Sequence, residues 1–111
     1  MAKQVTKRPA PAVRKEQIVQ AGLLVARRVG WEGITYKAVA EHVGIAAPSL
    51  VYHYRTMTQL KRAIVRGAIK ADDGLVVAMA VKAGDFQRAK VDELLYIRGE
   101  HQLEGWSPCL S

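Results

Sequence analysis

A stretch of 20 residues, 35–54, constrains the fold of this chain more than any other part of its sequence. It reads TYKAVAEHVGIAAPSLVYHY and contains two short segments with helical apolar spacing, separated by Gly44. Thr35 is a good N-cap for the first segment, and Gly44 ends it because glycine readily leaves helical geometry. Pro48 suits the first turn of the second segment, where its missing N–H is not needed. The stretch therefore predicts two short helices joined by a tight turn, the helix-turn-helix arrangement.

Longer helices are expected on both sides of this stretch. Apolar residues recur at helical spacing from about Ala12 to Val29, and Gly30 marks the end of that helix. Thr56 and Gln59 have the spacing of a capping box, so another helix should run from Met57 to about Ala71. The residues expected to face the core from these four helices are Ile18, Ala21, Gly22, Val25, Val29, Ala38, Val39, Val43, Leu50, Val51, Leu60, Ile64, Gly67 and Ala68.

The remaining sequence predicts two more helices. Breaks are marked by Asp72-Asp73-Gly74 and by Gly84-Asp85. The segment between them, Leu75–Val81, is apolar on every side, so a helix there must be buried by other elements or by another subunit. The last helix is amphipathic and ends near Glu104-Gly105. Its apolar residues are Phe86, Ala89, Leu94, Leu95, Ile97 and Leu103. The expected fold class is therefore all-α.

The charge of the chain is unevenly distributed. Residues 1–70 carry 13 Lys and Arg against three acidic residues (Glu16, Glu32 and Glu41), a net charge of +10. Residues 71–111 carry four basic residues against seven acidic ones, a net charge of −3. A basic first part suits contact with a polyanion such as nucleic acid, whereas the second part is expected to do something else.

Several classes of protein are disfavoured by the composition. Cys109 is the one cysteine, and no Cys or His cluster has the spacing of metal ligands, so we expect neither a metal nor a cofactor. The longest apolar run, Leu75–Val81, is far too short to cross a bilayer, and residues 1–13 lack the apolar core of a signal peptide. We therefore expect a soluble, cytoplasmic protein without a membrane partner.

Enzymatic activity is not expected either. The acidic pairs Asp72/Asp73 and Asp92/Glu93 are adjacent in sequence, so their side chains diverge around a helix and make poor acid and base partners. None of the three histidines has an adjacent nucleophile together with a group to orient it.

The basic residues outside the helix-turn-helix leave two interpretations open. Residues 1–13 are expected to form a disordered basic arm, which is either a solvated tail or an arm that follows phosphates or enters a minor groove. Arg27 and Arg28 either oppose the dipole of the first helix or contact DNA. The same choice between a solvated face and a DNA contact applies to the charges of the fourth helix, namely Lys61, Arg62, Arg66 and Lys70.

Many positions of the chain agree in one register with a known family. The matching positions are Thr35, Val39, Ala40, Val43, Gly44, Ile45, Pro48, Ser49, Leu50, Tyr52, His53, Tyr54 and Leu60, preceded by Ile18, Ala21 and the connection Gly30-Trp31-x-Gly33-Ile34. Over about residues 14–70 the chain resembles the DNA-binding domain of the TetR family of bacterial transcription regulators. The resemblance implies a homeodomain-like, three-helix domain, with about three further helices after it.

The resemblance also implies where DNA is bound. The third helix, about residues 47–54, is expected to read the major groove as half of a homodimer on a two-fold symmetric operator of double-stranded DNA. Thr35 is expected to hold a phosphate and Lys37 to face the DNA. The full set of DNA-binding residues implied in this way is Thr35, Tyr36, Lys37, Ala46, Ala47, Pro48, Ser49, Tyr52, His53, Arg55 and Lys61.

Four positions depart from the family pattern. Val51 stands where a backbone-contacting Tyr is common. Met57 stands where a Lys is frequent, which leaves Arg55, Lys61 and Arg62 as substitutes. Ala46 replaces the usual turn Ser and is followed by Ala47, so few long side chains are available to read bases. Specificity is then expected to be modest, or to depend on Lys37, Tyr52, His53 and the arm.

The chain is also short for this family. Only residues 71–111 follow the expected fourth helix, and two short helices cannot enclose a ligand cavity of several hundred Å³. We therefore expect no small-molecule inducer. The expected organisation is a basic arm at 1–13, a DNA-binding domain at 14–71, a helical oligomerisation segment at 72–105 and a tail at 106–111. A reduced regulator of this kind would suit a bacterial cell, including one that carries it on a phage or mobile element.

Two functions remain open on the sequence. The leading one is a dimeric, repressor-like DNA-binding regulator. The alternative is a protein-interaction module in which the helix-turn-helix fold serves as an adaptor or inhibitor of a host protein, with Leu75–Leu103 as its contact surface.

Overall fold

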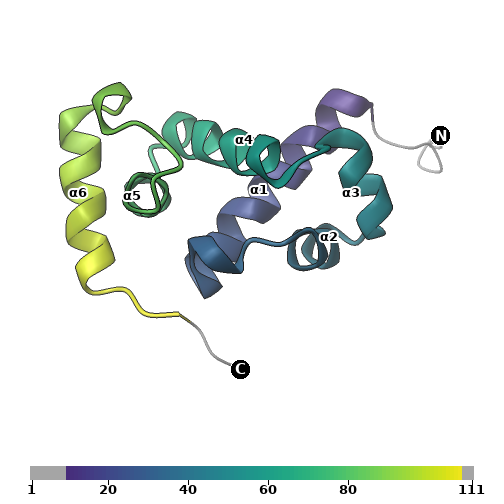
Figure 1. Ribbon diagram of the computed structural model, residues 1–111, viewed down its shortest axis with the longest axis horizontal. Helices are drawn as coiled ribbons and strands as arrows, with labels where there is room; N and C mark the ends of the chain where they lie inside the picture. The colour runs from purple at the N-terminus through teal and green to yellow at the C-terminus, as the bar shows by residue number, and fades with distance from the viewer. Residues whose placement is uncertain (1–9, 109–111) are drawn as a thin grey trace, which may run out of the picture.

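The computed structural model describes residues 10–108, and this part of the chain is helical without strands (Figure 1). The α-helices are α1 (Pro11–Val29), α2 (Tyr36–Val43), α3 (Ala47–His53), α4 (Met57–Lys70), α5 (Gly74–Lys82) and α6 (Glu93–Glu104). Single 3₁₀ turns lie at η1 (Trp31–Gly33) and η2 (Arg88–Lys90). Helices α1 and α4 lie in the middle of the molecule, α2 and α3 at one end, and α5 and α6 at the other. The expectation of an all-α fold is confirmed.

The local signals of the sequence set the ends of α2, α3 and α4. The Thr35 hydroxyl caps α2 by accepting a hydrogen bond from the Ala38 N–H (3.0 Å), and Gly44 ends α2 in the left-handed conformation at φ 91°. The Thr56 hydroxyl caps α4 in the same way, by accepting from the Gln59 N–H (3.1 Å). The Gln59 side chain reaches back to the N–H of Arg55 (3.1 Å), one residue earlier than in a standard capping box.

The first helix begins earlier than the boundary of the predicted arm. The arm was expected to extend to Val13, whereas Pro11–Val13 form the first turn of α1, with Pro11 at a position that needs no N–H. Residues 1–9 of the predicted arm lie outside the described residues.

Glycines bring α1 and α4 into close contact. A Cβ atom at Gly22 would overlap the Ile64 side chain, and one at Gly67 would overlap the side chain of Val19. Gly22 of α1 thus leaves room for the side chain of Ile64 from α4, and Gly67 of α4 leaves room for that of Val19 from α1. The largest fully buried side chains of α1 to α4 are Ile18, Val39, Leu50, Leu60, Ile64 and Val65.

Two expected core positions are wrong. Val51 is 38 % exposed, because the short α3 is anchored by Leu50 and the next position is rotated by about 100° around the helix. Val29 is 42 % exposed at the very end of α1. Gly67 is partly buried, like Ala38 and Val43, and it faces Val19 of α1 as expected, whereas the buried Val65 of α4 was not predicted.

Helix α5 is buried as its sequence predicts, and α6 is the element that covers it. Backbone atoms meet directly in this pair, because a Cβ atom at Gly99 of α6 would overlap the carbonyl of Gly74 at the start of α5. The carboxylate of Asp92 caps α6 by accepting from the Leu95 N–H (3.1 Å). Lys82 of α5 pairs with Glu100 of α6 (3.0 Å), and this hydrogen bond is the main reason why the pKa of Glu100 is lowered and that of Lys82 raised.

Two features of the last predicted helix are wrong. Helix α6 begins at Glu93, and residues 86–92 form an irregular segment that includes η2. Its buried residues are Leu95, Tyr96 and Gly99, whereas Leu94 is 69 % exposed and Ile97 is 48 % exposed. The contact between Gly99 and Gly74 fixes the rotation of α6, so the side that carries Leu94 and Ile97 faces away from α5.

Three contacts fasten the α5–α6 pair to the C-terminal end of α1. Both oxygens of the Asp73 carboxylate accept hydrogen bonds from the Arg27 guanidinium (2.9 Å each). This ion pair gives Arg27 a role within the fold. The indole N–H of Trp31 donates to Asp85 (2.6 Å), and that of Trp106 donates to the carbonyl of Arg27 (2.6 Å). Trp106 therefore packs on α1, although it was expected in a tail, while residues 109–111 of that tail lie outside the described part of the chain. None of the described helices combines the length and apolar character that a membrane span requires.

Replacing Asp73 with alanine is expected to lower the free energy of unfolding by about 1–2 kcal/mol. The change removes the cap of α5, where Asp73 accepts from the Val76 N–H (3.4 Å), and also the bidentate pair with the half-exposed Arg27. Urea unfolding followed by circular dichroism measures the effect. Glu104→Ala, which removes a carboxylate exposed on α6, is the matched control, and equal stability of the two variants would contradict the prediction.

Candidate nucleic-acid interface

Helix α3 is held against the core along one side and is open to solvent along the other. Leu50 is its fully buried anchor. At its C-terminal end, the Tyr36 hydroxyl of α2 donates to the carbonyl of Tyr54 (3.0 Å). On the solvent side, Ser49 is exposed and Tyr52 is 78 % exposed. The helix-turn-helix thus presents the outer side of α3 as a rigidly supported surface.

The residue that follows α3 fixes this helix to α1 as well. Tyr54 is partly buried, and the ammonium group of Lys15 lies 5.6 Å from the centre of its ring. Burial raises the pKa of the Tyr54 phenol, and the nearby carboxylate of Glu16 raises it further. The phenol therefore stays protonated at neutral pH, as an ordinary tyrosine also does.

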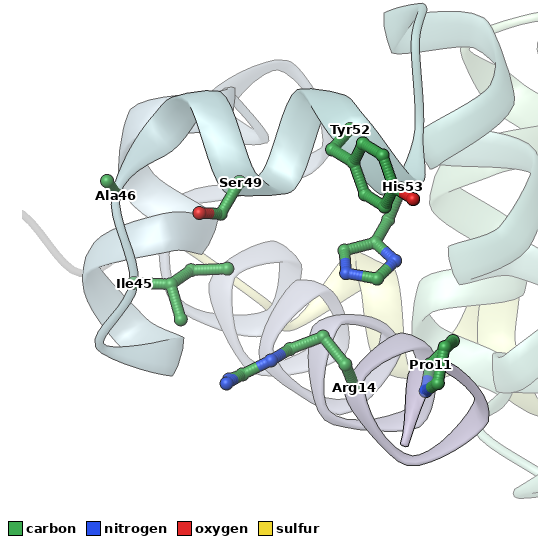
Figure 2. A pocket seen from close by; sticks show the side chains of 7 residues that line it. All are labelled: Pro11, Arg14, Ile45, Ala46, Ser49, Tyr52 and His53. Carbon is green, nitrogen blue, oxygen red and sulfur yellow. The ribbon is translucent and has the colours of Figure 1, made fainter. Parts of the chain in front are cut away.

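A hollow of about 540 Å³ lies between the first turn of α1 and the outer side of α3 (Figure 2). We call it the α1–α3 hollow, and its lining residues are Pro11, Arg14, Ile45, Ala46, Ser49, Tyr52 and His53. Figure 2 shows the His53 ring pointing from α3 toward α1 and the Arg14 side chain extending along α1 toward the Ile45 side of the hollow. The rings of Tyr52 and His53 pack edge to face, with their centres 5.3 Å apart.

The structure separates the residues implied in DNA binding into groups. The exposed ones are Thr35, Lys37, Ala46, Pro48, Ser49, Tyr52 and Arg55, and the partly buried ones are Tyr36, Ala47, His53 and Lys61. Four of them, Ala46, Ser49, Tyr52 and His53, are brought together in the α1–α3 hollow.

Two residues of this set have contacts within the protein that account for their positions. Tyr36 donates its hydroxyl to α3 as described above. The ammonium group of Lys61 lies 5.4 Å from the centre of the Trp31 ring, and Lys61 lines a separate hollow together with Asp85. Tyr36 thus supports the end of α3, and Lys61 packs on Trp31 from α4. Neither residue lines the α1–α3 hollow.

Three lining residues, Pro11, Arg14 and Ile45, are not among the residues that the sequence assigns to DNA binding, and Arg14 is the charged one. It carries a full positive charge in the first turn of α1, next to Lys15. The helix dipole disfavours cations at the N-terminal end of a helix. A pair of basic residues at this position was therefore a signal in the sequence for a role other than stabilising α1.

A second group of surface residues lies on α6. Leu94 and Ile97 are exposed, and a shallow hollow of about 650 Å³ beside Ile97 is lined by charges of both signs. Those charges are Arg98, Glu100 and Glu104. A surface with charges of both signs does not favour binding of a polyanion, so this surface differs in character from the one on α3.

Comparison with known proteins gives one informative likeness. No family model matches the chain, and no solved structure matches it significantly. Over 95 residues, 86 % of its length, the chain is 35 % identical to a protein of Mycobacterium tuberculosis (strain ATCC 25618 / H37Rv) that is named an uncharacterised HTH-type transcriptional regulator. The chain is therefore a homologue of a protein named for a helix-turn-helix. It spans 41 % of the length of that relative.

Proposed function

We propose that this chain is a DNA-binding transcriptional regulator of the TetR type, which acts as a dimeric repressor and inserts α3 into the major groove of a two-fold symmetric operator. The observation that carries the proposal is the outer side of α3, where the large aromatic side chain of Tyr52 is 78 % exposed beside Ser49. The name of the mycobacterial relative supports transcriptional regulation. The net charge of +10 over residues 1–70 supports a polyanionic partner.

The proposed contacts follow from the chemistry of the exposed side chains. Lys37 and Arg55 carry positive charges that can neutralise phosphates, and the Thr35 hydroxyl can donate to a phosphate while its oxygen caps α2. Ser49 and Tyr52 can donate to or accept from base edges, and Ala46 and Ala47 offer small apolar surfaces to a thymine methyl group. Pro48 sits in the first turn of α3 among these groups.

Dimerisation is proposed through α6. Its outer side exposes Leu94 and Ile97, and a second subunit that covers them would remove apolar surface from water. The same exposed pair is the observation that favours the alternative function, a protein-interaction module in which α6 contacts a host protein. The two functions differ in whether α3 or α6 carries the activity.

The salt dependence of DNA binding tests the proposed function. We expect a fluorescein-labelled duplex of mixed sequence, about 30 base pairs long, to bind with a logarithmic salt slope of about −0.9 for each phosphate neutralised. Lys37 and Arg55 alone then give about −1.8 per subunit, which is about a tenfold loss of affinity between 50 and 200 mM NaCl. Fluorescence anisotropy measures the slope. Binding without salt dependence, or no binding at 50 mM NaCl, would refute the proposal.

A further inference from the structure

We propose that the α1–α3 hollow seats a phosphate of the DNA backbone, with Arg14 of α1 as its charged partner. This inference rests on the proposed function, because it assumes that α3 enters a major groove. It adds a second helix to the interface and gives a role to a residue that lies 33 positions before the recognition helix in the sequence. It also assigns the hollow a ligand of one chemical class, a phosphodiester anion.

The charges around the hollow favour an anion. Among the described residues 10–108, Arg14 is the one permanently charged residue that lines the hollow, and no carboxylate lines it. The Arg14 guanidinium donates to the neutral side chain of Gln17 (3.1 Å), which leaves most of its five N–H donors for a ligand. The neighbouring Glu16 accepts a hydrogen bond from Gln20 (2.9 Å) along the exposed side of α1. Arg14 therefore has no carboxylate partner among the described contacts that would compete with a phosphate.

The opposite wall of the hollow supplies further donors. The Ser49 hydroxyl and the Tyr52 phenol come from α3, and the His53 ring points from α3 into the gap (Figure 2). Hydroxyl and imidazole N–H groups are ordinary partners of phosphate oxygens. A phosphate in the hollow would thus be approached from both helices. The volume of about 540 Å³ leaves room for the group with its adjoining sugar.

The dimensions of DNA put a phosphate at this position. The major groove is about 12 Å wide, and a helix with its side chains is about 10–12 Å across. A helix inserted into the groove therefore fills it, and an element packed along the flank of that helix lies over a bordering strand. The first turn of α1 flanks α3 in this way, since Pro11 and Arg14 line the same hollow as Ser49 and His53. Arg14 then faces backbone phosphates, and its contact positions the protein without reading sequence.

The experiment compares Arg14→Gln with Arg66→Gln by anisotropy on the same labelled duplex, over a series of NaCl concentrations. Both changes remove one arginine charge, but Arg66 is exposed on α4 and lies outside the hollow. We expect Arg14→Gln to reduce the magnitude of the salt slope by about 0.9 per subunit and to weaken binding about fivefold at 100 mM NaCl. Arg66→Gln should retain the slope of the wild type, and Arg14→Lys should retain most of it because the charge is kept.

A double-mutant cycle with His53→Ala tests whether both walls hold the same phosphate. Two residues that share one ligand are coupled, so the double variant should bind about threefold or more tighter than the product of the single effects predicts. Thermal unfolding of each variant verifies folding. If the wild type shows salt-dependent binding while Arg14→Gln and Arg66→Gln have equal slopes, the phosphate seat is overturned and the proposed function stands. If the wild type does not bind the duplex, both are overturned.

Discussion

Gly99→Ala is expected to lower the free energy of unfolding by about 3 kcal/mol or more. The added Cβ atom would overlap the carbonyl of Gly74, and the nearest atoms on both sides of the contact belong to the backbone. A flexible side chain could move aside, but here α5 and α6 must separate to make room. Because residues 74–80 of α5 are all buried and α6 is one of the elements that cover them, separation would expose apolar residues to water.

Urea unfolding followed by circular dichroism measures this loss. Gly105→Ala is the matched control, since Gly105 follows α6 at a negative φ and has no atom within 4 Å of the position of an added Cβ. The control is expected to stay within about 0.5 kcal/mol of the wild type. If Gly99→Ala unfolded at the same urea concentration as Gly105→Ala, the direct backbone contact between α5 and α6 would be wrong.

The largest effect on DNA binding is expected from the double change Lys37→Glu and Tyr52→Ala, which should weaken binding about 50-fold or more at 100 mM NaCl. The first change turns a proposed phosphate contact into a repulsive charge. The second removes a side chain that is 78 % exposed and therefore contributes little to the fold. The thermal unfolding midpoint should consequently stay close to that of the wild type, which separates this effect from a loss of folding.

The control for this pair also decides between the two candidate functions. Leu94→Ala shortens another exposed side chain, on α6, away from α3. A regulator that acts through α3 should lose DNA binding in the first variant, and in the second it should lose only the part of the affinity that dimerisation through α6 contributes. If the protein keeps its biological function with Lys37→Glu and Tyr52→Ala together but loses it with Leu94→Ala, the protein is an interaction module. Val77 is unsuitable for this comparison, because it is fully buried and its replacement would act on stability.

The parts of the fold that could be predicted are those with local causes. Thr35, Gly44 and Thr56 act within one turn of their own positions, so the ends of α2 and α4 and the turn between α2 and α3 follow from the sequence. The rotation of α6 has a cause that is distant in sequence, since Gly99 meets Gly74. The apolar pattern of α6 alone could not show which of its apolar residues, Leu94 or Leu95, faces α5.

The candidate site likewise has residues that could be predicted from local sequence and residues that could not. The exposed positions of α3 follow from the helix-turn-helix pattern, and the structure leaves Ser49 and Tyr52 open to solvent as the pattern requires. The DNA contacts assigned to these residues remain predictions. Arg14 was not found, because nothing in the sequence says that the first turn of α1 lies beside α3. Lys61 was assigned to DNA as a substitute for the Lys that the family pattern places at position 57, whereas the Trp31 ring is beside it in the fold.

The junction between α1 and the α5–α6 pair has an optical consequence. The chain has two tryptophans, and both indole N–H groups donate hydrogen bonds at this junction, from Trp31 to Asp85 and from Trp106 to the carbonyl of Arg27. The tryptophan emission of the protein therefore originates where its two parts are fastened together, with no contribution from α3. The two tryptophans therefore serve as intrinsic fluorescent labels of the junction, and opening or closing of the junction can be followed without attaching a dye.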